Sequence, residues 1–202
     1  MVERKPEQDP RGVYDLNVPE LRQKHITWCG LTSVAMVMKH WKYRTSPEEL
    51  FTEMCGTYSE SRENYSPALK PTFNSFALRI KKNLEPQPPF DPLTARVFTN
   101  EWFEKLKERT GQTPHDLLQH FVIDRKIPCI IRVPEHTMVV GGVDLGAERY
   151  LINNPAQDKI KTSVSFSDID IPWASSYETK YPGNTRYLML AIYPENYNWK
   201  FS

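Results

Sequence analysis

A cysteine stands at the beginning of a segment whose apolar pattern is compatible with a helix. Cys29 lies in the stretch QKHITWCGLTS, which runs into VAMVMKHW. A thiol attacks as the thiolate, and the free N–H groups and dipole of a helix N-terminus lower the pKa of a thiol placed there. A free cysteine is more commonly a small buried hydrophobic residue. Position alone therefore makes Cys29 a candidate nucleophile, with burial as the alternative.

Three neighbours of Cys29 extend the candidate site. Gln23 precedes Cys29 by six residues, so its amide N–H groups could join the Cys29 backbone N–H in an oxyanion hole. Gly30 leaves room for a substrate backbone beside the thiol. Trp28 either forms a wall of a cleft or packs in the core, and the core is favoured because large aromatic side chains are mostly buried.

The partners that a nucleophilic cysteine needs occur more than a hundred residues later. His136 opens the run HTMVVGGVD, and an imidazole at the start of a buried strand needs a polar partner. Asn154 ends the next apolar run, where its amide could orient the imidazole. Asn153 is a rival for that role, and strand alternation puts the two amides on opposite faces. The plainer interpretation makes His136 a loop residue and Asn154 a turn former before Pro155.

The elements that must position these residues divide the chain into a helical part and a strand-rich part. Residues 1–17 are polar and rich in proline, which is typical of an irregular arm. The patterns predict helices over 32–43, 47–55, 72–83, 100–109 and 113–125. They predict strands over 127–133, 136–143, 149–154, 166–170 and 186–193. We therefore expect an α+β fold in one domain, 1–202, with an antiparallel sheet over 127–193.

Composition excludes several classes of function. Lys and Arg total 26 against 25 Asp and Glu, so charge gives no reason to expect a nucleic-acid partner. The longest apolar runs are too short to span a membrane. The first residues lack the apolar core of a secretory signal. We expect synthesis in the cytoplasm, and secretion by a leaderless route stays open.

The cysteines form neither a disulfide framework nor a metal motif. Cys29, Cys55 and Cys129 are an odd, scattered set without CxxC, which is typical of reduced thiols. Zinc bound by these cysteines and His136 would lack the usual paired spacing. We interpret Cys55 and Cys129 as inert buried thiols. The sequence also contains no GxGxxG or GxxxxGK motif, so we expect no cofactor and no metal.

Taken together, the motifs resemble the papain-like cysteine peptidase fold. The closest resemblance is to the branch of bacteriocin-leader-processing (double-glycine) peptidases and their stand-alone relatives. That branch has Val-Pro and Gln before Cys-Gly-Pro-Thr-Ser, an Ala-Met-Val helix, a His followed by an apolar run ending in Gly-x-Asp, and a strand ending in Asp-Pro-Ala. The matching segments are Val18–Pro19, Gln23, Cys29–Ser33, Ala35–Val37, His136, Val139–Asp144 and Asn154–Ala156.

The resemblance implies a role for each matching residue. Cys29 would be the nucleophile, His136 the general base and acid, Asn154 the orienting third member, and Gln23 the oxyanion donor. The central helix would begin at the catalytic cysteine. Leu31 replaces the usual Pro of the motif, and Asn154 replaces the usual Asp, although papain-type enzymes themselves have Asn there. Residues 57–125 have no counterpart in the resemblance, and we expect them to form a family-specific helical and loop region.

These features predict a thiol hydrolase, and specifically a cysteine peptidase that acts on a protein or peptide. Two alternatives stay open. The same triad would serve a transglutaminase or deamidase, for example a bacterial effector or toxin acting on a host protein. A catalytically silent binding module with the papain fold is the other.

Overall fold

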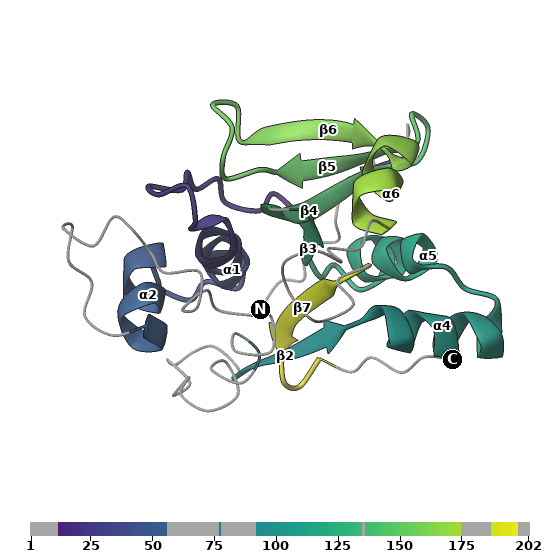
Figure 1. Ribbon diagram of the computed structural model, residues 1–202, viewed down its shortest axis with the longest axis horizontal. Coiled ribbons are helices and arrows are strands. Elements are labelled where there is room, and N and C mark those ends of the chain that lie inside the picture. Colours follow the sequence, from purple (N-terminus) through teal and green to yellow (C-terminus); the bar gives the residue numbers. More distant parts are fainter. Residues whose placement is uncertain (1–11, 56–76, 78–91, 135, 175–186, 198–202) are drawn as a thin grey trace, which may run out of the picture.

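Helices lie on both sides of a central sheet (Figure 1). The computed structural model describes residues 12–55, 77, 92–134, 136–174 and 187–197. Helices α1 and α2 lie on one side of the sheet, and α4, α5 and α6 lie on the other (Figure 1). The predicted α+β class with an antiparallel sheet is confirmed.

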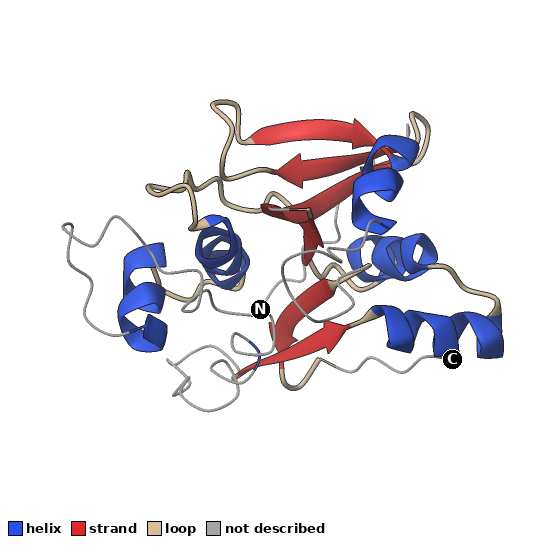
Figure 2. Ribbon diagram, viewed as in Figure 1, coloured by secondary structure: helices blue, strands red, loops and turns tan. Residues whose placement is uncertain are grey.

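The sheet contains seven strands, and every pair of neighbours is antiparallel. The strands are β1 (Val13–Asp15), β2 (Leu93–Phe98), β3 (Cys129–Val133), β4 (His136–Asp144), β5 (Arg149–Asn153), β6 (Lys161–Ser165) and β7 (Met189–Pro194). Their order is β2-β7-β3-β4-β5-β6, and β1 pairs with β4. Strand β4 therefore lies in the interior of the sheet (Figure 2).

The described helices agree largely with the sequence patterns. They are α1 (Cys29–His40), α2 (Pro47–Cys55), α4 (Asn100–Thr110), α5 (Pro114–Gln119), the π-helix η2 (His120–Asp124) and α6 (Phe166–Ala174). Gly111 ends α4 in a left-handed conformation with φ 75°, which glycine adopts without strain. Thr113 and Asp116 form a capping box that starts α5. The helix expected over 72–83 lies almost entirely outside the described residues.

The strand alternation produces one core on each face of the sheet. Ile130, Val139 and Leu190 face α1 and α2. Cys129, Val140 and Ala191, their neighbours along the same strands, belong to the core on the other face. Both faces of the central strands are thus buried, which explains why these strands read as continuous apolar runs.

Helix α1 begins at Cys29, as the resemblance implies and three residues before the apolar pattern of 32–43. Three local expectations were wrong. Strand β1 lies in the expected irregular arm, and β2 lies in the region 57–125 expected to contain only helices and loops. The segment 166–170 begins helix α6, because the Ser165 hydroxyl accepts a hydrogen bond from the Asp168 backbone N–H at 3.0 Å and so caps the helix.

Candidate active site

Cys29 is the first residue of α1, the most deeply buried of the described helices. All residues from Leu31 to Met38 are buried, and α1 packs on β3, β4 and α2. The Cys29 side chain is partly exposed. Since the first N–H groups of a helix have no partner within it, the N-terminus of α1 places unpaired N–H groups and a positive dipole end at the thiol.

His136 and Asn154 are in direct contact. His136 Nε2 lies 2.7 Å from Asn154 Oδ1, and the same oxygen accepts the Ala156 backbone N–H at 3.0 Å. The backbone N–H can only donate, so the acceptor must be the amide oxygen. His136 therefore carries a hydrogen on Nε2, which leaves Nδ1 as the ring nitrogen available to the Cys29 thiol.

Cys29 and His136 shift each other's pKa towards the charged pair. Burial raises the pKa of Cys29, but the hydrogen bond to His136 and its charge, together with hydrogen bonds from Thr137, outweigh burial and lower it. Burial lowers the pKa of His136, but the hydrogen bond and charge of Cys29 and the hydrogen bond of Asn154 outweigh burial and raise it. The geometry favours a thiolate–imidazolium pair.

The two adjacent asparagines have different roles. Asn153 is buried with 1% of its surface exposed, and its Nδ2 donates to the Val18 carbonyl at 3.1 Å. Asn154 is the one that contacts His136. Of the two amides, Asn153 joins the N-terminal segment to the sheet.

Gln23 is joined to the loop that follows Asn154. Its backbone N–H donates to the Pro155 carbonyl at 3.0 Å, and its Nε2 donates to the Ile26 carbonyl at 3.2 Å. This bond uses one of the two amide N–H groups and leaves the other for an oxyanion. The Gln23 side chain thus keeps the donor capacity that an oxyanion hole needs.

The sequence profile of the Peptidase_C39 like family matches residues 15–185. The chain belongs to this family. The match includes all of residues 57–125, the region that has no counterpart in the motif resemblance. None of the curated proteins matches the sequence.

Two solved structures resemble this family member in fold. One is a double glycine motif protease from an AMS/PCAT transporter, in complex with the leader peptide; it is 20% identical, the match covers 90% of this chain and 94% of that one, and the TM-score is 0.52. The other is from Bacillus anthracis and is described as a C39-like peptidase; the identity is 16%, the coverage is 91% and 98%, and the TM-score is 0.57. The predicted papain-like fold is confirmed.

Trp28 and Gly30 lie on either side of the thiol in this family member. Trp28 is 2% exposed and packs between the ring of His25, 4.5 Å away, and that of Phe51, 5.3 Å away. It is a core residue, so its role as a cleft wall is not supported. Gly30 is partly exposed in the first turn of α1.

In the described ranges, three buried polar side-chain atoms that belong to residues near Cys29 in the sequence have no hydrogen-bond partner. They are Gln23 Oε1, Thr27 Oγ1 and Thr32 Oγ1. Buried polar groups are normally paired, and exceptions concentrate at functional sites. The sequence gives no sign of these unpartnered atoms, nor of the role of Thr137, a polar residue in an apolar strand that helps to lower the pKa of the Cys29 thiol by hydrogen bonding.

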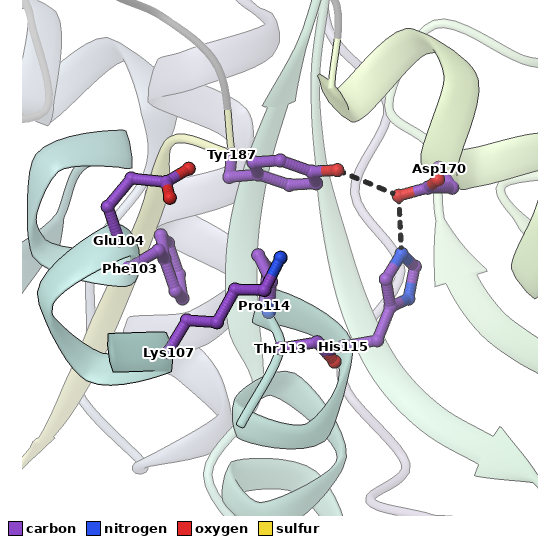
Figure 3. Close-up of a pocket in the computed structure, with 8 residues that line it drawn as sticks. All are labelled: Phe103, Glu104, Lys107, Thr113, Pro114, His115, Asp170 and Tyr187. Carbon is purple, nitrogen blue, oxygen red and sulfur yellow. Dashed lines mark hydrogen bonds and ion pairs between the residues drawn. The ribbon is translucent and has the colours of Figure 1, made fainter. Parts of the chain in front are cut away.

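A second group of hydrogen-bonded side chains, centred on His115, lies on the opposite face of the sheet. His115 bonds to the Tyr150 hydroxyl at 2.8 Å through Nδ1 and to Asp170 at 2.9 Å through Nε2. Tyr187 also donates to Asp170 (Figure 3). Of these residues, His115, Asp170 and Tyr187 border a cavity of about 290 Å³ between α4, α5 and α6. Because both His115 nitrogens are occupied, we assign His115 a structural role.

Cys129 lies apart from Cys29. It is fully buried in the core on the far face of the sheet, and burial raises the pKa of its thiol. Its Sγ donates to the Ile127 carbonyl at 3.6 Å.

Among the residues described, no helix is long and apolar enough to cross a membrane.

Proposed function

We propose that this protein is a cysteine peptidase in which Cys29 is the nucleophile, His136 the general base and acid, and Asn154 the residue that orients His136. The observation that carries the proposal is the continuous chain of contacts from Cys29 through His136 to Asn154 at the N-terminus of α1. The family to which the chain belongs supports the assignment.

The geometry suits acyl transfer by a thiolate. The Cys29 thiolate attacks the carbonyl carbon of a peptide bond, and the oxyanion accepts hydrogen bonds from the Cys29 backbone N–H and the Gln23 amide. His136 gives its proton to the departing amine, and a thioester remains on Cys29. His136 then removes a proton from water, which attacks the thioester and releases the second product.

Asn154 acts on the imidazole. By accepting from Nε2–H it fixes the tautomer in which Nδ1 faces the thiol, and it stabilises the imidazolium while the thiolate exists. The proposed substrate is a peptide or an unfolded segment of a protein. The solved double glycine motif protease was crystallised with a leader peptide, which supports a peptide as the substrate class.

The proposal is tested by incubating the protein with a peptide library and identifying new termini by mass spectrometry, with and without an added primary amine. We expect cleavage by the wild type and none by Cys29→Ala or His136→Ala. Amine incorporation in place of cleavage would contradict the peptidase and indicate acyl transfer. Absence of cleavage, incorporation and any thioester on Cys29 would indicate a binding module.

A further inference from the structure

Thr137 is a buried polar residue that touches the nucleophile. It follows His136 in β4 and is 6% exposed. Val139, two residues further along the strand, packs in the core beside α1, so strand alternation places the Thr137 side chain on the face that α1 covers. Hydrogen bonding by the Thr137 hydroxyl and backbone contributes to the lowered pKa of the Cys29 thiol. The next residues of the strand, Met138, Val139 and Val140, are all buried and apolar. A hydroxyl at this position therefore needs a reason other than packing.

The surrounding structure fixes Thr137 against α1. Ser33 lies one helical turn after Cys29, so the two side chains share a face of α1. The Ser33 hydroxyl, itself buried, donates to the Thr137 carbonyl at 3.3 Å. On its other side, Thr137 pairs with Arg132 of β3. Pairing with β5 begins at Val139, so the first residues of β4 extend beyond that ladder towards the thiol.

We propose that the Thr137 hydroxyl is a hydrogen-bond donor to the Cys29 thiolate, which holds Sγ towards His136 and sets the balance between the amount of thiolate and its nucleophilicity. The inference rests on the proposed role of Cys29 as nucleophile. A donor stabilises the thiolate, so more of it exists at a given pH. The same donor makes each thiolate less reactive, because nucleophilicity falls as the thiol pKa falls.

His136 supplies the charge that acts on Cys29 within the described part of the chain. The other charged or titratable groups of neighbouring elements lie on α2, on β3, in the preceding loop and at the far end of α1. They are Glu48 (paired with Lys24), Glu49, Glu53, Arg132, His25, Lys39 and His40. A change in Cys29 titration on removal of the Thr137 hydroxyl therefore reports on the hydrogen bond itself.

The test compares Thr137→Val, which keeps the shape and removes the hydroxyl, with Thr137→Ser, which keeps the hydroxyl. Thr32→Val is the matched control, because Thr32 is also buried on α1 but its hydroxyl has no partner among the described residues. The probe is a small aromatic disulfide, and the rate of its reaction at Cys29 is measured against pH, with the site assigned by mass spectrometry. Thiolate absorbance at 240 nm, relative to Cys29→Ala, gives an independent midpoint.

For Thr137→Val we expect the midpoint to rise by about one pH unit, as for loss of a hydrogen bond to a charged group. The rate below the midpoint falls by about tenfold, while the plateau at high pH rises by about threefold. Thr137→Ser and Thr32→Val should follow the wild type. A general disturbance of the site would lower the rate at every pH. The pH–rate curves of Thr137→Val and of the wild type should instead cross, and this crossing identifies the loss of the hydrogen bond.

A Thr137→Val protein with the midpoint and plateau of the wild type, in an experiment where His136→Ala changes both, would overturn the inference and leave the proposed function standing. If Cys29 titrates as an ordinary thiol in the wild type and in His136→Ala alike, the proposed function itself is wrong. Circular dichroism checks that each variant is folded. Thr137→Ala is measured in the same way and supplies the same comparison if Thr137→Val does not fold.

Discussion

Two contacts fix the orientation of the His136 ring. Asn154 accepts from Nε2, and hydrogen bonding with the Cys29 thiol raises the pKa of the ring. Asn154 is in turn held by the Ala156 backbone. The side chain that orients the proposed base is therefore itself held by the backbone, which reduces the entropy that would be lost when the base acts.

Substitution of the two asparagines should give opposite results. Asn154→Ala removes the acceptor for His136, so we expect kcat for peptide cleavage to fall by at least about tenfold with little loss of stability. Asn154→Asp keeps an acceptor oxygen and should retain activity. Asn153→Ala removes a buried donor to Val18 and should instead lower the free energy of unfolding by about 1–3 kcal/mol. Steady-state kinetics and urea unfolding separate the two, and a larger kinetic loss for Asn153→Ala would contradict the assignment.

At the scale of elements, β4 must both place His136 and bend to pair with its neighbours. The pairing of β4 with β5 shifts between Val140 and Gly142. A Cβ added at Gly142 would lie 2.5 Å from the Tyr14 carbonyl oxygen and 2.7 Å from Leu151 Cδ1. The backbone of β1 could make room only by leaving β4, so glycine is required at this close approach.

Gly142→Ala should therefore destabilise the sheet, with a fall of about 1–3 kcal/mol in the free energy of unfolding. Gly141→Ala is the control, because its Cβ would meet a side chain, Val18 Cγ2 at 2.9 Å, which can shift more easily than a paired backbone. Urea unfolding measures both. If Gly142→Ala lost no more free energy of unfolding than Gly141→Ala, β1 would be able to move away from β4 without a cost in stability.

His40, near the C-terminus of α1, makes the stability sensitive to acid. Burial, and secondarily the charge of Lys42, lowers the pKa of His40 to about 4, whereas in the unfolded chain it titrates near 6.5. Between these values the unfolded state binds more protons, so stability falls as the pH drops. From pH 7 to pH 5 we expect the wild type to lose about 2 kcal/mol more than His40→Gln in urea unfolding. Parallel losses in the two proteins would refute this role of His40.

Prediction from the sequence worked best for residues whose side-chain type is tied to a chemical role. Cys29, His136 and Asn154 could be found because each polar residue stands at a boundary of an apolar run. The short polar strands β1 and β6 have no such pattern, with no residue fully buried in either. Thr137 was missed for a different reason, since a threonine in a strand agrees with β propensity and its contact with α1 depends on tertiary packing.

At the scale of the whole molecule, the sheet separates the proposed chemistry from a structural network. Cys29 lies on the face covered by α1 and α2. On the other face, His115 and Asp170 join α5 to α6, and Tyr187, which precedes β7, bonds to Asp170 (Figures 1 and 3). That residues 1–202 form a single domain stays a prediction.

Asp170→Ala should affect stability without affecting catalysis. The substitution removes the acceptor for His115 and Tyr187, so we expect the free energy of unfolding to fall by about 1–2 kcal/mol. The pH profile of kcat/KM for peptide cleavage should equal that of the wild type, in contrast to Asn154→Ala. A changed pH profile would mean that the far face takes part in the reaction.

The central claim is that Cys29 is a thiolate held by His136, and brief alkylation with limiting iodoacetamide near neutral pH tests it most directly. Peptide mass spectrometry gives the order in which the three cysteines react. We predict that Cys29 is alkylated first and that His136→Ala removes its advantage, because the imidazolium no longer stabilises the thiolate. Labelling of Cys55 or Cys129 before Cys29 in the folded wild type would contradict the account.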